Sequence, residues 1–384
     1  MTQPRSFITW QPVLTDHQAY TYEELSQQAK SPLLAYVLTL EDNTRRSQGW
    51  LDTQVGSIDR RLIPQKKWMQ YCYRHMREHQ RDVHIFGSAF QSIKMIYCLL
   101  LAIWFKVEFY LVSEPYSPIS LGYFSEDKFA IANIKARARP YIYRLYALVL
   151  NRWVSGVFAI SKKAIIQYTK AGISSDKIFP FGYFIPSLKS DSPGPSGVYS
   201  KNEKLRIVFV GALIARKGLD LLIDAVSSLG DRVVLDIYGS GEPRLYNIDG
   251  VTVRYCGVIP FGSAQEVIAR YDVLVLPSRH DGWGVVVNEA ICAGVPVICS
   301  DQVGASVILE RFTAGMIFNI QEPHSLKKTL EFFLQDSQLS QELTSATNVA
   351  AIAIQPDVAA GYMLSIMQVK GLKRKEVSSP WYLE

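Results

Sequence analysis

Two kinds of apolar pattern alternate along this 384-residue chain. Short continuous runs, such as 33–40 and 205–210, are typical of strands buried on both faces of a sheet. Segments with apolar residues every three or four positions lie between such runs and predict helices. Further strand candidates lie at 7–11, 82–87, 108–112, 157–161, 177–183, 233–238, 251–255, 272–276 and 296–300. The regular alternation predicts doubly wound parallel sheets of the α/β class.

Local signals place the first helices. The run 22–30 contains good helix formers, with Thr21 positioned as the cap and Glu24 three residues later. The run 68–79 predicts another helix, whereas 43–64 is mixed and turn-rich.

Length and composition predict two domains. A chain of 384 residues exceeds the usual size of a single hydrophobic core. Residues 186–202 are rich in proline, glycine and serine and contain few apolar residues, which is typical of a linker. The expected parts are an N-terminal domain at 1–187, a linker at 188–204, a C-terminal domain at 205–355, and a tail at 356–384 that packs back on the N-terminal domain.

Charge and cysteine usage indicate the compartment and the kind of partner. The five cysteines show no paired or metal-ligand spacing, so we expect free thiols in a reducing compartment. The N-terminus lacks the apolar core of a signal peptide, which predicts a cytoplasmic protein. Residues 1–187 carry 23 Lys and Arg against 14 Asp and Glu, whereas residues 188–384 carry 18 against 21. The basic half predicts either an anionic partner or an ordinary solvated surface.

Two segments carry features of membrane proteins. The segment 93–105 is the most apolar in the chain, but its roughly 13 residues are too few to cross a bilayer, so we expect a buried core helix. The segment 135–153 alternates arginines with tyrosines and ends in a tryptophan. This mixture suits the surface of an anionic membrane, and it also suits a helix packed on the sheet with its arginines reaching solvent. The first interpretation predicts a peripheral protein at the inner face of the membrane.

The stretch 278–294 carries the strongest functional signal. It follows a short apolar strand, contains Gly282 and Gly284, and then becomes helical. A strand, a glycine loop and a helix start present free backbone N–H groups and the positive end of a helix, which favours phosphate. If the helix covers both, Asp281 and Glu289 lie about two turns apart and face the same ligand.

Four loops of the C-terminal half follow predicted strands, where a doubly wound sheet binds its ligand. They span 211–217, 239–242, 278–284 and 301–304. The first loop offers Arg216 and Lys217, two positive charges that would neutralise a diphosphate. The carboxylates of Glu289 and Asp281 would accept hydrogen bonds from ribose and sugar hydroxyls. Together these features predict a nucleotide-sugar site.

Several motifs of the C-terminal half match a known family. They are 209–218, 239–242, 272–278 and 281–298, and the similarity extends over about residues 205–320. On these motifs the chain resembles the family 4 glycosyltransferases, which are retaining enzymes with two Rossmann-like domains facing a central cleft (the glycosyltransferase B-type fold). The resemblance implies transfer of a hexosyl group from a UDP- or GDP-sugar to a glycan or lipid-linked acceptor. The products would be cell-surface polysaccharide, lipopolysaccharide or glycolipid.

The resemblance assigns roles to individual residues. Lys217 corresponds to the diphosphate-binding lysine, and Glu289 to the second of two paired glutamates, which holds the ribose. Asp281 stands where the first glutamate faces the donor sugar; it keeps the charge but reaches one methylene less. Ala212 stands where the family often has an arginine, and Arg216 is a candidate substitute. The implied donor-binding set is Gly211, Arg216, Lys217, Gly239, Gly241, Gly282, Trp283, Gly284, Val285 and Glu289.

The implied chemistry needs neither an enzyme nucleophile nor a metal. Retention in this family is explained by front-face attack, in which the leaving diphosphate helps to deprotonate the acceptor hydroxyl. Basic side chains neutralise the diphosphate and no Asp-x-Asp motif occurs, so we expect no metal and no cofactor. His17, placed in the loop after the first strand, and Glu114, at a strand end, are the candidate acceptor-side catalytic residues beside Asp281 and Glu289.

Two other functions fit the same residues. A sugar-nucleotide 2-epimerase would share the fold and the donor site. A non-catalytic nucleotide-sugar or glycan-binding protein would account for Ala212 and Asp281. A redox enzyme is not expected, because no Gly-x-Gly-x-x-Gly follows a strand, and no nucleic-acid partner is expected.

Overall fold

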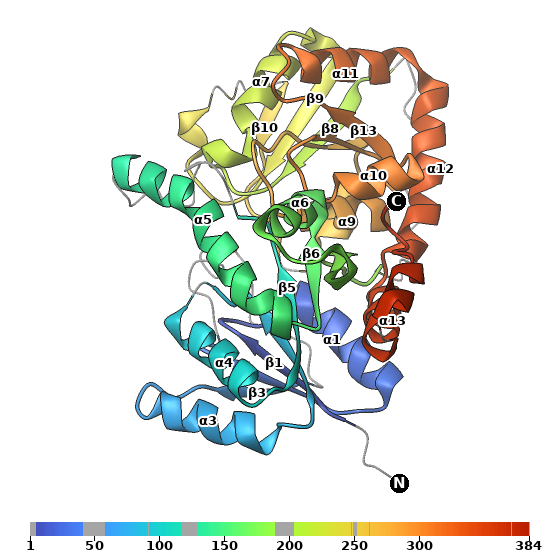
Figure 1. Ribbon diagram of the computed structural model, residues 1–384. Helices are drawn as coiled ribbons and strands as arrows, with labels where there is room; N and C mark the ends of the chain where they lie inside the picture. Colours follow the sequence, from blue (N-terminus) through green and yellow to red (C-terminus); the bar gives the residue numbers. More distant parts are fainter. Residues whose placement is uncertain are drawn as a thin grey trace.

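Two parallel sheets, one from each half of the chain, form the protein (Figure 1). The computed structural model describes residues 5–40, 58–90, 92–116, 129–188, 203–246, 248, 252–260, 262–369 and 371–383. The first sheet has the order β3-β2-β1-β4-β5-β6-β7 and the second the order β10-β9-β8-β11-β12-β13. All described neighbouring strands pair in parallel. The prediction of two doubly wound parallel sheets is confirmed.

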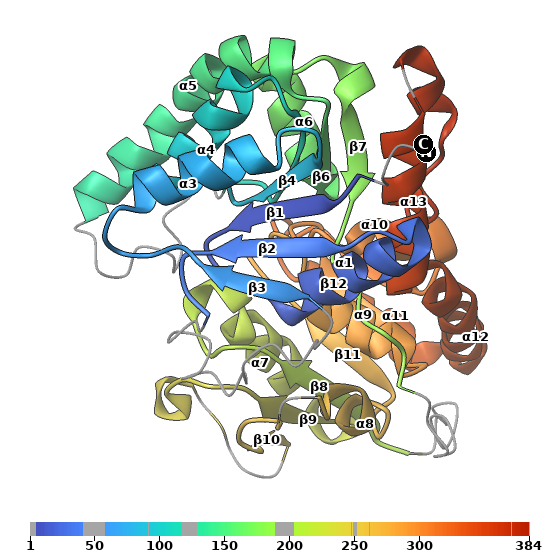
Figure 2. The same cartoon turned by 90° about the horizontal axis from the view of Figure 1, so that it is seen from below.

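The first sheet and its helices come from residues 7–181. Its strands are β1 (Phe7–Gln11), β2 (Leu33–Val37), β3 (Asp59–Leu62), β4 (Val83–Gly87), β5 (Glu108–Ser113), β6 (Gly156–Ile160) and β7 (Ile178–Phe181). The helices are α1 (Asp16–Ala29), α3 (Trp68–Glu78), α4 (Ile93–Trp104), α5 (Phe129–Trp153) and α6 (Ser161–Ala171). Figure 2 shows α3, α4 and α5 gathered on one side of this sheet and α1 with the C-terminal helix α13 (Pro356–Gln368) on the other.

The second sheet repeats the arrangement. Its strands are β8 (Leu205–Val210), β9 (Val233–Tyr238), β10 (Val253–Tyr255), β11 (Val273–Leu276), β12 (Val297–Ser300) and β13 (Gly315–Phe318). The helices are α7 (Leu219–Ser227), α8 (Ala264–Ile268), α9 (Val285–Cys292), α10 (Ser306–Phe312), α11 (Ser325–Gln335) and α12 (Ser337–Ala353). The strands β11 and β12 are buried at every position, as their continuous apolar sequences require.

The start of α1 differs from the prediction. The helix begins at Asp16 rather than Tyr22, because Thr15 caps it: the backbone N–H of Thr15 donates to Oε1 of Gln18 at 3.3 Å. His17 therefore lies in the first turn of a helix, and its placement in a loop was wrong.

Two further predictions about the N-terminal half were wrong. The region predicted as turn-rich contains β3, an edge strand whose sequence Asp-Arg-Arg-Leu has no apolar alternation and pairs with β2. Residues 43–57 of that region lie outside the described residues. The helix α4 is not simply a core helix: Met95 and Cys98 are buried, but Ile93 and Trp104 are 78% and 76% exposed. Mean apolarity does not say which face of a helix is covered.

The C-terminal segment returns to the first sheet. The helix α13 packs along α1, and Arg374 donates hydrogen bonds to the carbonyl oxygen of Ser155 and the hydroxyl of Tyr110 at 2.6 and 2.9 Å. Most of the linker expected at 188–204 lies outside the described residues. No described helix alone has the length and apolarity to cross a bilayer; α12 and α13 reach that threshold only as a pair bent by 49°.

Candidate functional site

A cleft of about 420 Å³ lies between the two sheets, where the loops after their strands meet. Of the predicted site residues, eleven contribute to its lining: His17, Glu114, Gly211, Arg216, Lys217, Gly239, Asp281, Trp283, Gly284, Val285 and Glu289. Gly241 and Gly282 do not line it. The fold thus brings together residues that are up to 272 positions apart in the sequence.

Lys217 and Asp281 form an ion pair in the wall of this cleft. The Nζ atom of Lys217 donates to Oδ2 of Asp281 at 2.5 Å, and Nη1 of Arg216 lies 3.9 Å from Oδ1. Burial would raise the pKa of Asp281, but the charges of Lys217 and Arg216 outweigh it and hold that pKa below its ordinary value. Both cations therefore sit beside an ionised carboxylate, and Arg216 is further held by the carbonyl oxygen of His280 at 2.9 Å.

Glycines let the loops of the second sheet approach one another. Gly239 has φ of +152°, and a β-carbon there would lie 1.8 Å from the carbonyl oxygen of Gly211. Gly218 has φ of +70°, and a β-carbon there would lie 2.0 Å from the carbonyl oxygen of Pro277. Any side chain at these two positions would push the Arg216–Lys217 loop away from the cleft.

The helix α9 points its amino end at the cleft. It begins after Gly284, which has φ of +92°. Because they stand in the first turn, the N–H groups of Val285 and Val286 have no partner within the helix. The helix does not reach Asp281, which lies in the preceding loop, although Asp281 and Glu289 both line the cleft. The N–H of the Trp283 ring donates to Oδ1 of Asn288 at 2.9 Å, which fixes the loop against the first helical turn.

Glu289 stands on the cleft side of α9. Burial of its carboxyl raises its pKa to about 7. Near neutral pH this group is therefore divided between its neutral and ionised forms.

The first sheet contributes a linked group on the opposite wall. The hydroxyl of Tyr183 donates to Oε1 of Glu114 at 2.7 Å, and the ring of His17 lies 4.2 Å from the Tyr183 ring, centroid to centroid. Nε2 of His17 is 2.9 Å from the hydroxyl of Thr15. Gly282 faces this group: a β-carbon there would lie 2.5 Å from Oε2 of Glu114. Gly282 therefore leaves space for the carboxylate of Glu114 and does not line the cleft.

Sequence reasoning missed three lining residues on this wall: Asp16, Tyr20 and Tyr183. Asp16 and Tyr20 were predicted in the loop before the helix at 22–30, so the face of α1 on which they lie was not predicted. Tyr183 was predicted as the last residue of the strand at 177–183, but β7 ends at Phe181 and Tyr183 lies two residues beyond it.

Comparison with known proteins places the fold in a class. The chain superposes on Anabaena HepE in complex with UDP-glucose with a TM-score of 0.69, covering 94% of this chain and 99% of that chain at 14% sequence identity. It also superposes on a glycosyltransferase of Rickettsia africae with a TM-score of 0.67, covering 95% of this chain and 98% of that chain at 11% identity. The protein has the glycosyltransferase B-type fold of two Rossmann-like domains.

The match to a family model lies in the second half of the chain. Residues 197–349 match the family model of glycosyl transferases group 1. An uncharacterized glycosyltransferase of Methanocaldococcus jannaschii is 30% identical over 145 residues, which cover 35% of this chain and 37% of the relative. A lipopolysaccharide core biosynthesis glycosyltransferase of Rhizobium meliloti is 27% identical over 165 residues, covering 41% of this chain and 46% of the relative. The chain thus spans less than half the length of these curated relatives.

Proposed function

We propose that this protein is a retaining hexosyltransferase. It takes a UDP- or GDP-sugar as donor and a glycan or lipid-linked acceptor, in the synthesis of cell-surface polysaccharide, lipopolysaccharide or glycolipid. The observation that carries the proposal is the convergence of Arg216, Lys217 and the amino end of α9 on one cleft that Glu289 also lines. The match to group 1 glycosyl transferases covers the same residues.

The donor binds by exchanging ion pairs. The oxygens of the diphosphate bind Nζ of Lys217 and the free N–H groups at the start of α9, and thereby release Asp281 from Lys217. The released carboxylate accepts hydrogen bonds from hydroxyls of the donor sugar, and Glu289 accepts those of the ribose. Because the side chain of aspartate is short, Asp281 is suited to a hydroxyl that approaches the Lys217 loop closely.

Transfer follows with retention. The acceptor hydroxyl attacks the anomeric carbon from the side of the leaving diphosphate: the new C–O bond forms as the old one breaks, and the proton passes to a diphosphate oxygen. Arg216 and Lys217 balance the charge that develops on the leaving group, so the reaction proceeds without a metal or cofactor. Glu114 and His17, on the opposite wall, bind the acceptor.

The acceptor is presented at a membrane. The helix α5 packs on the sheet through Ala147 and Leu150, which are buried, but its opposite side is apolar and uncovered. Large side chains on that side are 63–79% exposed: Ile134, Tyr141, Leu145 and Leu148. The exposed Arg137, Arg144 and Arg152 lie along the same helix. An apolar stripe flanked by arginines is complementary to an anionic lipid surface, and we propose that α5 holds the protein at the inner face of the membrane as a peripheral protein.

Loss of Lys217 tests the donor site. The variant Lys217→Ala removes one charge-assisted contact to the diphosphate, which contributes roughly 1.5–3 kcal/mol, so we expect donor affinity to fall about 10- to 100-fold. Calorimetry with a panel of UDP- and GDP-sugars measures the affinity, and thermal unfolding confirms that the variant is folded. The exposed Lys328, on α11 of the same domain, supplies the control Lys328→Ala. Equal donor affinity in the wild type and Lys217→Ala would contradict the site.

A further assay distinguishes the transferase from the two alternative functions, a 2-epimerase and a non-catalytic binding protein. Incubation with the sugar nucleotide alone yields an epimer only if the protein is a 2-epimerase. Donor binding without transfer to any acceptor of a broad panel identifies a non-catalytic binding protein. Transfer with an unchanged anomeric configuration, read by nuclear magnetic resonance of the product, supports the proposal.

A further inference from the structure

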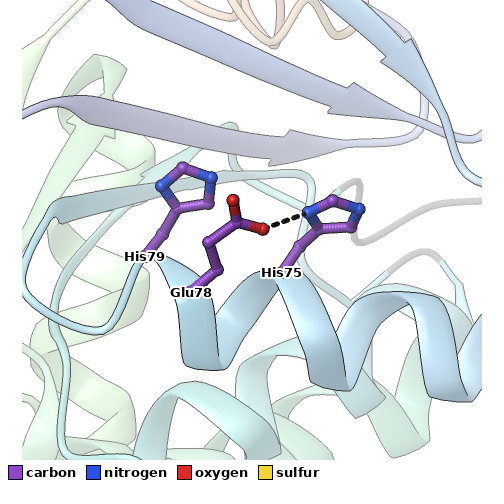
Figure 3. A group of neighbouring side chains, drawn as sticks. All are labelled: His75, Glu78 and His79. Carbon is purple, nitrogen blue, oxygen red and sulfur yellow. Dashed lines mark hydrogen bonds and ion pairs between the residues drawn. The ribbon is translucent and has the colours of Figure 1, made fainter.

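A second group of chemically active side chains lies outside the cleft, on the last turn of α3. It consists of His75, Glu78 and His79 (Figure 3). The helix α3 ends just before β4 begins, whereas the cleft lies where the strands end. In a parallel sheet these are opposite edges. The group is therefore separate from the proposed donor and acceptor sites.

The three side chains converge. His75 and His79 are four positions apart on a helix and so lie on one face. Figure 3 shows the carboxylate of Glu78 between the two rings, and its Oε2 lies 3.1 Å from Nδ1 of His75. One ligand atom from each residue lies within 4.8 Å of the others. Ligand atoms around tetrahedral zinc lie about 3.4 Å apart, because the bonds are about 2.1 Å long, so small side-chain rotations suffice.

His79 is held in the orientation of a metal ligand. Its Nδ1 lies 2.9 Å from Oδ2 of Asp82, while its Nε2 is buried and has no hydrogen-bond partner among the residues that the structure describes. Histidines that bind metals almost always use their second ring nitrogen to contact a carboxylate or carbonyl, which fixes the ring and raises its basicity. An unpaired buried nitrogen is unfavourable in the absence of a ligand, and a metal would satisfy it.

The surroundings favour a cation. His79 is the residue that follows α3, and the carbonyl groups at a helix end carry partial negative charge. Two imidazoles and one carboxylate suit zinc and similar transition metals, whereas magnesium and calcium require oxygen ligands.

We infer that His75, Glu78 and His79 bind one divalent transition metal of the zinc class, with water in the fourth position and Asp82 orienting His79. The bound metal stabilises the end of α3 and its connection to β4. It contacts no residue of the cleft, so its binding is independent of the proposed transferase activity.

Titration of the full-length protein with zinc chloride, after treatment with a chelator, tests the inference. We expect calorimetry to show one tight site per chain and zinc to raise Tm. The variant His79→Ala loses this binding, and Asp82→Asn weakens it about 10-fold or more. Magnesium produces neither effect. The control is His324→Ala, because His324 is exposed in the other domain.

A second variant, Glu78→Gln, keeps the test valid if His79→Ala fails to fold. The side chain of Glu78 is 58% exposed, so its replacement leaves the packing intact. We expect weaker zinc binding at an unchanged Tm of the metal-free protein. Absence of a one-to-one zinc complex in the wild type, or equal affinity in wild type, His79→Ala and Glu78→Gln, would show that the group is only an ion pair and would overturn the inference.

Discussion

Asp281 and Glu289 are two carboxyls in one cleft whose pKa values move in opposite directions. Burial raises the pKa of each, but at Asp281 the neighbouring Lys217 and Arg216 reverse the effect. At Glu289 burial acts alone and raises the pKa to about 7. Groups of the same type with separated pKa values are frequent at functional sites, because each environment suits a different task.

The raised pKa of Glu289 predicts a pH dependence of stability. The ordinary value is 4.5, so the folded state holds this proton to higher pH than the unfolded state does. The resulting stabilisation is fully present below about pH 4.5 and is lost as pH rises through about 7. We therefore expect the free energy of unfolding of the wild type to fall, relative to Glu289→Gln, between about pH 5 and about pH 8. Urea unfolding of both proteins measures this, and parallel pH profiles would refute it.

At the scale of single residues, the sequence identified which residues belong to the site but not which of them contact one another. The candidates Lys217, Asp281 and Glu289 could be named from motif spacing alone. That Asp281 pairs with Lys217 could not, because the two are 64 positions apart and meet only when the loops after β8 and β11 pack together.

Among the elements, α5 confirms one interpretation of its pattern, packing on the sheet, whereas contact with a membrane stays a prediction. Ala147 and Leu150 share a core cluster with residues of β4 and β5, so the helix does cover the sheet. Tyr143 and Tyr146 pack against Phe90, which follows β4, with ring centroids 5.5 and 4.4 Å away. The other side leaves Leu145 and Leu148 exposed. A helix of 25 residues offers room for both surfaces (Figure 1).

Substitutions that place negative charge on the exposed side of α5 test the membrane proposal. We expect wild-type protein to co-sediment with vesicles that contain anionic lipid at low salt and to be released by high salt. Leu145→Glu with Leu148→Glu should weaken the partition at least about tenfold, because two buried leucines each contribute roughly 1.5–3 kcal/mol. The control is Val349→Glu with Ile352→Glu on α12, which has the same spacing and comparable exposure, 61% and 73%. Equal loss in both variants, or no binding by the wild type, counts against the proposal.

The element boundaries were predictable where local chemistry was unambiguous. The helix at 68–79 is confirmed as α3, and the helix start at Val285 as α9. The start of α1 was wrong because two capping signals compete, and the one at Thr15 prevails. The strand β3 was missed because its pairing with β2, not its own sequence, makes it a strand.

At the scale of the whole molecule, the C-terminal segment ties the two sheets together. Trp381 is fully buried, and its ring lies 4.3 Å from that of Phe184 and 5.9 Å from that of Phe181, centroid to centroid. Phe184 in turn contacts Trp283 beside the cleft, at 6.0 Å. A continuous aromatic cluster therefore runs from the tail to the site.

Truncation of Trp381 should destabilise the protein strongly. Replacement of a buried aromatic by alanine costs about 3–5 kcal/mol, so we expect Trp381→Ala to lower the free energy of unfolding by this amount. Trp381→Phe retains most of the apolar surface and should cost less. Leu383→Ala is the control, because Leu383 lies two residues away and is 55% exposed. Urea denaturation distinguishes them; similar stabilities for Trp381→Ala and Leu383→Ala would show that the tail is dispensable.

The sequence by itself determined the α/β class, the two parallel sheets, and the loops of the second sheet that carry glycines and basic residues. It could do so because buried strands and ligand-binding loops each have a characteristic local sequence. Only the tertiary structure decided which residues meet: Glu114 with Tyr183, Asp281 with Lys217, and Trp381 with Phe184. The reason is physical. Contacts between distant segments depend on how sheets and helices pack, and the hydrophobic effect that drives this packing is non-directional and leaves no periodic signal at the contacting positions.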